Sequence, residues 1–219
     1  MLEYQQQFIQ YALDGGVLKF GEFQLKSGRI SPYFFNTGLF NRGSQLDKLG
    51  QFYAQALINS GYQADVLYGP AYKGIPLAAA AAIAYSRLKA DMPFAFNRKE
   101  LKDHGEGGLL VGAPLQGKVW IVDDVITAGT SVRESVEIIV AAGAIPAGVL
   151  IALDRQEKGQ NDLSAVQEVS AQFGIPVVAI ITLANIVEFI EKNDDTSEKL
   201  ALIKAYRRKF GIDVNSNDP

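Results

Sequence analysis

Cysteine is absent from this chain of 219 residues, and histidine occurs once, at His104. Without cysteine there is no disulfide framework, and a single histidine nearly excludes a zinc ion held by protein side chains. A metal ion would therefore be a hard cation on oxygen ligands, and we expect Mg²⁺ that phosphate groups carry.

Long apolar runs and strong charge of one sign are also missing. The small apolar stretch 78–84 is too short to cross a membrane, and residues 1–10 lack the basic-then-apolar order of a secretion signal. The net charge of −3 argues against non-specific binding of nucleic acid, so an anionic substrate has to meet local groups of Lys and Arg. We expect a cytoplasmic protein with neither a nucleic-acid partner nor a membrane partner.

A large apolar share is what the sequence does contain. Hydrophobic residues make up 48% of the chain and charged residues 21%, which is enough for one substantial core. We therefore expect a single domain over residues 1–219, with only the polar end 215–219 outside its core.

The spacing of apolar residues alternates between the strand period and the helix period from residue 64 onward. Strands are expected at 64–68, 93–97, 118–123, 147–153 and 176–181, and helices at 75–89, 131–142 and 163–173. This alternation predicts an α/β fold with a doubly wound, mainly parallel central sheet that helices flank.

Other elements are expected outside this alternating region. A helix at 2–13, strands at 17–25 and 33–36, a helix that begins at Ser44 with Asp47 as its capping partner, and helices at 184–192 and 198–210 complete the prediction. Residues up to about 40 are expected to form a small hood lobe beside a core at about 60–182.

The most informative motif is residues 119–131, VWIVDDVITAGTS. Its apolar run fits a buried parallel strand, so Asp123 and Asp124 fall at the carboxyl end of the strand, where open α/β sheets bind ligands. The turn 127–131 can surround a phosphate with backbone N–H groups and hydroxyls at a helix N-terminus, and the carboxylates can accept hydrogen bonds from ribose hydroxyls. An arbitrary apolar run of this kind is more often a plain buried strand with a polar turn, but the complete order favours a ribose-phosphate site.

Two other nucleotide motifs are missing from the sequence. No G-x-x-x-x-G-K-[ST] pattern occurs, and residues 105–108 do not continue as G-x-G-x-x-G. A P-loop or a dinucleotide fingerprint is therefore unsupported.

Residues 68–76, YGPAYKGIP, follow the first core strand. The glycines allow close approach of the backbone, and Lys73 offers a point charge to a phosphate group. Taken alone, this stretch is equally well explained as a generic turn between a strand and a helix.

Residues 98–112 join two expected strands without helical spacing and combine cations with glycines. A solvated charged loop is the ordinary interpretation, but long helix-free connections in compact domains often act as lids. We therefore expect a mobile lid, in which His104 stabilises charge or transfers a proton.

The hood stretch 26–36, KSGRISPYFFN, places cations near aromatic rings. Phe34 and Phe35 can stack on a flat heterocycle, or they can belong to the core, where phenylalanine is more often found. Arg155 ends a core strand, and its planar fork suits a carboxylate, although a surface salt bridge is the ordinary alternative.

Residues 119–131 closely resemble the phosphoribosyl-pyrophosphate (PRPP) signature of type I phosphoribosyltransferases, and residues 68–76 resemble the pyrophosphate loop of that family, which can hold a cis peptide bond without proline. The hood stretch and Arg155 resemble the bacterial-type orotate phosphoribosyltransferases, and the likeness extends from Phe8 to about Gly211. It implies the type I fold and transfer of the ribose 5-phosphate group of PRPP to orotate, which gives orotidine 5′-monophosphate and pyrophosphate in pyrimidine biosynthesis.

The resemblance also implies roles for individual residues. PRPP would contact Lys26, Tyr72, Lys73, Arg98, Lys99, Lys102, His104, Asp123, Asp124, Val125, Ile126, Thr127, Ala128, Gly129, Thr130 and Ser131. Orotate would lie among Lys26, Phe34, Phe35, Thr127 and Arg155, and catalysis would depend on Lys73, Lys102, His104 and Asp124. Mg²⁺ would arrive on PRPP oxygens, and the lid at about 98–112 would enter the active site of the second subunit of a homodimer.

Two other functions remain open at this point. A phosphoribosyltransferase for a purine base or uracil would share residues 119–131 but has little use for Lys26 and Arg155, which suit a carboxylate. A non-catalytic PRPP-binding regulator would be expected to carry a basic DNA-binding element, and none is evident in the sequence.

Overall fold

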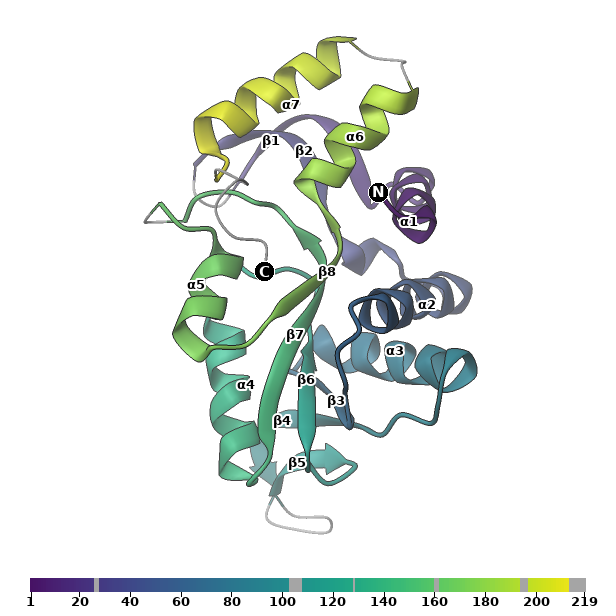
Figure 1. Cartoon of the computed structure of the whole chain (residues 1–219), viewed down its shortest axis with the longest axis vertical. Coiled ribbons are helices and arrows are strands. Elements are labelled where there is room, and N and C mark those ends of the chain that lie inside the picture. The colour runs from purple at the N-terminus through teal and green to yellow at the C-terminus, as the bar shows by residue number, and fades with distance from the viewer. Residues whose placement is uncertain (26–27, 103–107, 128, 160–161, 194–196, 213–219) are drawn as a thin grey trace.

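The computed structural model describes the whole chain except residues 26–27, 103–107, 128, 160–161, 194–196 and 213–219, and it leaves the side chains of 101, 102 and 197 undescribed. A six-stranded sheet lies between helices, and a two-stranded hood lies at one end of it (Figure 1). None of the helices in this described part combines the length and apolarity that crossing a bilayer requires.

The central sheet has the strand order β5-β4-β3-β6-β7-β8. Its strands are β3 (Val66–Gly69), β4 (Phe94–Lys102), β5 (Gly108–Gly112), β6 (Lys118–Val122), β7 (Ile145–Asp154) and β8 (Val177–Thr182). Neighbouring strands are parallel except β4 and β5, which are antiparallel. The predicted α/β fold with a mainly parallel sheet is confirmed.

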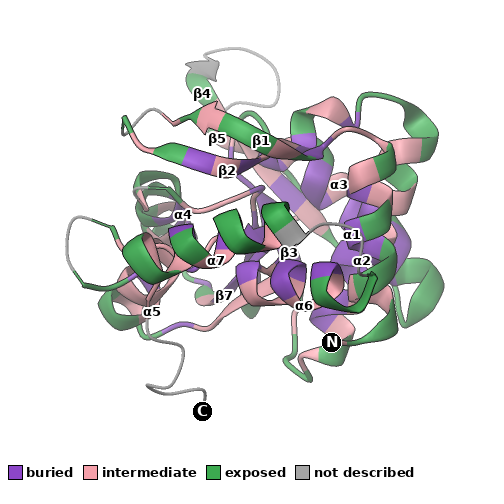
Figure 2. Cartoon of the chain, turned by 90° about the horizontal axis from the view of Figure 1, so that it is seen from above, coloured by how far each residue is buried: buried purple, intermediate pink, exposed green. Residues whose placement is uncertain are grey.

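Helices cover both faces of this sheet (Figure 1). The helices α1 (Glu3–Asp14), α2 (Gly43–Asn59), α3 (Gly74–Leu88) and α6 (Leu183–Asn193) contribute to one core cluster, and α4 (Thr130–Ala141) and α5 (Ala165–Phe173) contribute to the other. Figure 2 shows the buried residues concentrated between these helices and the strands.

Successive side chains of β6 enter different cores. Trp120 and Val122 belong to the cluster with α1, α2 and α3, whereas Val119 and Ile121 belong to the cluster with α4 and α5. All four are fully buried, since side chains alternate between the faces of a strand and both faces are covered here. This arrangement explains why residues 119–122 of β6 form an unbroken apolar run in the sequence.

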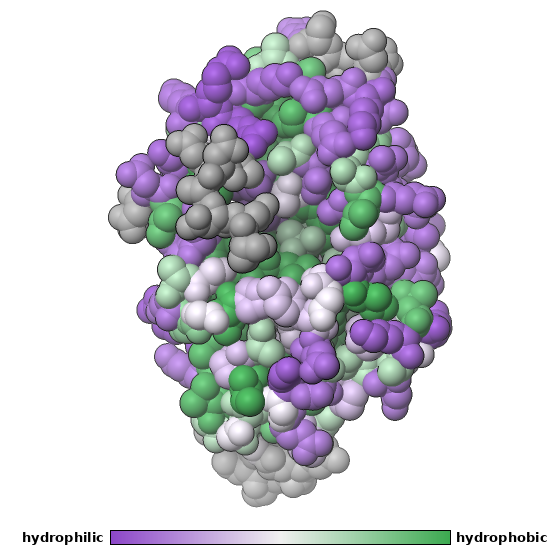
Figure 3. Space-filling model, viewed as in Figure 1, coloured by the Kyte–Doolittle hydropathy of each residue, from purple (hydrophilic) through white to green (hydrophobic). Residues whose placement is uncertain are grey.

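The hood is a hairpin of β1 (Leu18–Gln24) and β2 (Ile30–Phe35), followed by a short 3-10 turn, η1 (Thr37–Leu39). It is held from both ends of the chain: Phe8 of α1 lies 6.3 Å from the Phe35 ring, and Tyr206 of α7 (Ser197–Phe210) lies 6.4 Å from the Tyr33 ring, measured between centroids. On the face drawn in Figure 3, hydrophilic residues dominate the outer surface of α7. The predicted small N-terminal lobe is present.

Two local predictions differ from the structure. Residues 98–112 are not a plain loop, because β4 continues to Lys102 and pairs with β5 as an antiparallel ribbon at the edge of the sheet. An edge ribbon has little core to contact, so its charged sequence gave no strand signal.

The start of α2 is also different: its N-cap is Arg42, whose backbone N–H donates to Gln45 Oε1 at 3.2 Å, so the predicted cap at Ser44 is wrong.

Gly148 of β7 lies directly opposite Trp120 of β6, and a Cβ at this position would lie 2.5 Å from the indole ring. We therefore expect Gly148→Ala to lower the free energy of unfolding by about 1–3 kcal/mol, because a fully packed core cannot absorb the added methyl group. Urea-induced unfolding measures this change.

Gly43→Ala makes the same chemical change at the start of α2, where a Cβ meets no atom within 4 Å. It is expected to cause no loss of stability. Equal losses in the two variants would contradict the packing explanation.

Candidate active site

The backbone of Asp123 and Asp124 is fixed beyond the last residue of β6. The Asp123 N–H donates to Leu150 O at 3.0 Å, and the Ala152 N–H donates to Asp124 O at 2.9 Å. The buried Tyr53 hydroxyl of α2 donates to Asp123 O at 2.8 Å. Hydrogen bonds from a neighbouring strand and from a helix therefore hold both residues at the carboxyl edge of the sheet.

The two carboxylates have different partners. Asp123 Oδ1 accepts from the Asp124 N–H at 2.8 Å, and its Oδ2 accepts from the Ser131 hydroxyl at 3.0 Å. Asp124 Oδ1 accepts from the Val125 N–H at 2.8 Å, and its Oδ2 lies 2.6 Å from Lys73 Nζ. The side chains thus brace the turn that follows β6 and connect it to the loop that follows β3.

A cavity of about 250 Å³ lies beside this turn, at the N-terminus of α4. Its lining consists of Asp123, Val125, Ile126, Thr127, Gly129, Thr130, Ser131 and Val132. Gly129, the N-cap of α4, has a φ of +68°, a left-handed conformation that glycine adopts without a steric penalty. Backbone N–H groups and the positive end of the helix dipole make such a place suitable for a phosphate group.

Burial is the main reason that the pKa of Asp123 rises from 3.8 to about 6. The hydrogen bond from the Asp124 N–H lowers the pKa of Asp123, whereas the charge of Asp124 raises it further. The folded protein therefore keeps the charge of Asp123 at a cost in free energy.

The loop between β3 and α3 contains a cis peptide bond between Ala71 and Tyr72, the type of bond that the family resemblance suggests. The Ala71 N–H donates to the side-chain oxygen of Asn97 at 2.9 Å, so β4 supports this loop. Tyr72 is exposed, and Lys99 Nζ lies 5.2 Å from the centroid of its ring.

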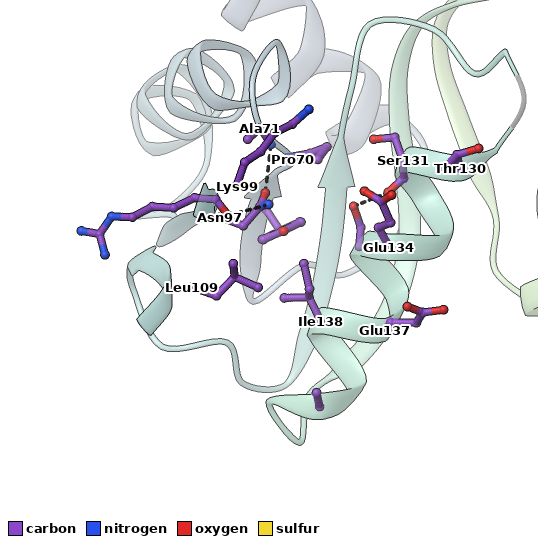
Figure 4. A pocket seen from close by; sticks show the side chains of 14 residues that line it. Pro70, Ala71, Asn97, Lys99, Leu109, Thr130, Ser131, Glu134, Glu137 and Ile138 are labelled. Atoms are coloured by element: carbon purple, nitrogen blue, oxygen red, sulfur yellow. Dashed lines mark hydrogen bonds between the residues drawn. The ribbon is translucent and has the colours of Figure 1, made fainter. Parts of the chain in front are cut away.

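A second cavity, of about 800 Å³, separates this loop and β4 from α4. It is lined by Tyr68, Pro70, Ala71, Asn97, Arg98, Lys99, Leu109, Thr130, Ser131, Glu134, Ser135, Glu137, Ile138 and Ala141. Figure 4 shows Asn97 and Lys99 on one wall and Ser131, Glu134 and Ile138 of α4 on the other. The fold therefore brings Arg98 and Lys99 to the same cavity as the loop after β3 and the first turn of α4.

Three of the predicted orotate residues, Phe34, Phe35 and Arg155, lie in or against the hood, whereas Thr127 lies in the turn after β6. Arg155 points toward β2: its Nη2 donates to Ser31 Oγ at 3.2 Å and to Glu157 Oε1 at 2.7 Å. The Phe34 ring packs on Phe23 at 5.4 Å, and the Phe35 ring packs toward α1. Neighbouring side chains of a strand point to opposite sides, so the two phenylalanine rings leave β2 in different directions.

Several predicted site residues lie outside the described part of the chain. They are Lys26, His104 and Ala128, together with the side chain of Lys102. Their roles remain predictions.

Three residues near the site were missed by the sequence-based prediction. Asn97 is the first polar residue after the apolar start of β4, and a polar residue in that place was a usable signal. The Tyr53 hydroxyl donates to Asp123 O, and Glu157 accepts from the Tyr33 hydroxyl. These partners are distant in sequence, so no local pattern revealed Tyr53 or Glu157.

Comparison with known proteins identifies the class. The profile of the phosphoribosyl transferase domain matches residues 41–181. The chain is 59% identical over 212 residues to the orotate phosphoribosyltransferase of Thiobacillus denitrificans, covering 97% of this chain and 100% of that protein. It is also 59% identical over 213 residues to that of Salmonella agona, with the same coverage. The crystal structure of orotate phosphoribosyltransferase from Francisella tularensis superposes with a TM-score of 0.86 at 48% identity, covering 94% of this chain and 99% of that one.

The chain therefore belongs to the phosphoribosyltransferase family. Within it, the chain belongs to the orotate phosphoribosyltransferases, as the sequence motifs indicated.

The raised pKa of Asp123 has a consequence for stability. Below pH about 3 the carboxyl group is largely protonated in both the folded and the unfolded chain, whereas above pH about 6 folding must bury its charge. We expect Asp123→Asn to raise the free energy of unfolding by about 1–2 kcal/mol at pH 7.5, with the gain fading as the pH falls toward 4. Urea unfolding at both pH values measures it.

Asp162→Asn serves as the control, because its carboxylate is 96% exposed. It is expected to leave the stability unchanged at both pH values. An Asp123→Asn protein that is less stable than the parent at pH 7.5 would show that the charge is held favourably instead.

Proposed function

We propose that this chain transfers the ribose 5-phosphate group of PRPP to orotate and releases orotidine 5′-monophosphate and pyrophosphate. The observation that supports this most strongly is the cavity at the N-terminus of α4, in a chain of the phosphoribosyltransferase family. Asp123 lines this cavity, and a hydrogen bond from the Asp124 N–H holds its carboxylate in place. A 5′-phosphate in that cavity would place the ribose hydroxyls beside the two carboxylates.

Charge separation is the main demand of this reaction. Displacement at the anomeric carbon develops positive charge on the ribose ring and negative charge on the leaving pyrophosphate. In our proposal, Asp123 and Asp124 accept the ribose hydroxyls and face the positive ring. The pyrophosphate is met by the cations Lys73, Arg98, Lys99, Lys102 and His104, with Tyr72 beside them.

Lys73 has to change partner in this scheme. Its Nζ is paired with Asp124 Oδ2 at 2.6 Å, but its side chain is 62% exposed. The Asp124 side chain is only 12% exposed, so its charge needs a new partner when Lys73 leaves. A phosphate oxygen can take over the solvent-accessible lysine as a ribose hydroxyl replaces it at Asp124. Asp124 then becomes available to the ribose.

The acceptor base would lie between the hood and the turn after β6. Lys26, Thr127, Phe34 and Phe35 would surround the orotate ring, and Arg155 would receive its carboxylate. That carboxylate separates orotate from uracil and the purine bases, and it requires a cation with a planar fork.

Mg²⁺ is the expected cofactor, and we propose that PRPP carries it. Among the described residues, no group of three or more His, Cys, Asp or Glu converges in a way that could hold a metal ion, and the oxygens of Asp123 and Asp124 already accept protein hydrogen bonds. The ion would neutralise charge on the pyrophosphate.

We also propose a cytoplasmic homodimer in which the ribbon of β4 and β5 reaches the active site of the second subunit.

The direct test is incubation of the protein with PRPP, Mg²⁺ and orotate, with the loss of orotate absorbance as the measurement. We expect turnover of orotate, no turnover of uracil or purine bases, and loss of activity after chelation with EDTA that added Mg²⁺ restores.

No turnover by folded protein would refute the transferase proposal. If PRPP still bound, a PRPP-binding regulator would become the better explanation. Turnover of a purine base in preference to orotate would instead identify a different transferase.

Sharing of the ribbon predicts complementation between inactive subunits. Lys102→Ala and Asp124→Ala are each expected to be inactive, but equal mixing and reassembly should restore about a quarter of the parent activity, because half of the dimers are hybrids with one intact site. Differently tagged subunits allow the hybrids to be purified and assayed. Inactive purified hybrids would mean that each ribbon serves its own subunit.

A further inference from the structure

Arg155 lies in a cluster of side chains that the proposed reaction does not by itself explain. Its guanidinium carbon lies 4.3 Å from the centroid of the Tyr33 ring, and its Nη2 lies 2.7 Å from Glu157 Oε1. The same Glu157 oxygen accepts from the Tyr33 hydroxyl at 2.9 Å. One carboxylate oxygen therefore ties Arg155 to the residue over which it stacks.

This cluster is shielded from solvent. The side chains of Arg155 and Glu157 are 20% and 11% exposed, and Tyr33 is fully buried between β2 and α7. An ion pair in such a place is screened less than a surface pair, and removal of one partner leaves the other charge poorly solvated.

The backbone between the two charged residues is fixed as well. Gln156 has a φ of +50°, an unfavourable value for a residue with a Cβ. Its N–H donates to Asp154 Oδ1 at 2.8 Å, and its Oε1 accepts from the Ala184 N–H at the start of α6 at 2.9 Å. These bonds keep Gln156 in the left-handed conformation, and strained residues of this kind concentrate at functional sites.

The hydrogen bonds of Arg155 leave part of its guanidinium available. Both bonds that its side chain donates to described residues start from Nη2, toward Ser31 and Glu157. Burial is the main reason that the pKa of the Tyr206 hydroxyl rises, and Arg155 and Glu157 are close enough to influence it as well. No hydrogen bond to a described residue starts from Nη1 or Nε, so these groups can donate to another acceptor without release of Glu157. A second carboxylate can bind while the first remains in place.

We propose that Glu157 is a positioning residue, which holds Arg155 against Tyr33 so that Nη1 and Nε face the carboxylate of orotate. This inference rests on the proposed function, in which Arg155 receives that carboxylate. An arginine that is already ordered loses less conformational entropy when the ligand binds. Glu157 thus acts on orotate binding through Arg155 and does not contact the reacting atoms.

The test is a steady-state comparison of Glu157→Ala with the parent. We expect the KM for orotate to rise about tenfold, while kcat and the KM for PRPP stay within about twofold, because only the orientation of Arg155 is lost. Glu157→Gln should recover part of the orotate KM, since it keeps an oxygen that accepts from Nη2 and Tyr33. The control is Asp162→Ala, which breaks the exposed Lys158–Asp162 pair in the same segment and should change nothing.

A double-mutant cycle separates positioning from direct binding. If Glu157 acts only through Arg155, the double variant Arg155→Ala, Glu157→Ala should bind orotate no more weakly than Arg155→Ala alone. A further loss in the double variant would refute the positioning role. A Glu157→Ala protein with an unchanged orotate KM would refute it too, and a lowered KM would show that Glu157 competes with orotate for Arg155.

Two measurements keep the outcome decisive. Tyr33→Phe removes only the hydroxyl that donates to Glu157, so if Glu157→Ala fails to fold, a rise of about threefold in the orotate KM of Tyr33→Phe supports the proposal and an unchanged KM refutes it. Absence of orotate turnover in the parent would refute the proposed function itself. Parent turnover with a Glu157→Ala protein of unchanged KM would refute only the role of Glu157.

Discussion

The parallel pairing of β6 with β7 does not stop where β6 ends, and the site depends on this continuation. The hydrogen bonds of the Asp123 N–H and of Asp124 O to β7 carry the rigidity of the sheet two residues beyond the strand. The carboxylates can then hold the following turn, and Gly129 can begin α4 so that the N-terminus of the helix borders the cavity. A sheet with both faces covered supplies the fixed frame that this geometry needs.

Much of this arrangement could be predicted, since the physical signals are local. An unbroken apolar run such as 119–122 is typical of a strand that is buried on both sides, and the polar residues that follow such a run lie at the edge where ligands bind. The helix N-terminus and the left-handed glycine come immediately afterwards in the chain. The strand, the two carboxylates, the turn and the helix N-terminus therefore follow one another along the chain, and a local pattern can predict all of them.

The remaining features depend on contacts between distant residues. The support of Ala71 by Asn97 crosses from one strand end to another, and the contact of Tyr53 with Asp123 O joins a helix to the sheet. Tyr53 and Glu157 carry no local pattern that distinguishes them from ordinary core and surface residues. The ribbon of β4 and β5 was missed for a different reason, because charged residues at an edge have no buried face to produce alternation.

The packing of the hood joins the two ends of the polypeptide. Tyr33 meets Tyr206, Arg29 lies 5.0 Å from the Phe210 ring, and the Lys158 N–H donates to Phe210 O at 2.8 Å. Contacts of such wide sequence separation form slowly. During synthesis on the ribosome, the sheet and the phosphate cavity can be assembled while the hood still lacks its outer layer. The surroundings of Arg155 can therefore be completed only after residues 206–210 have left the exit tunnel.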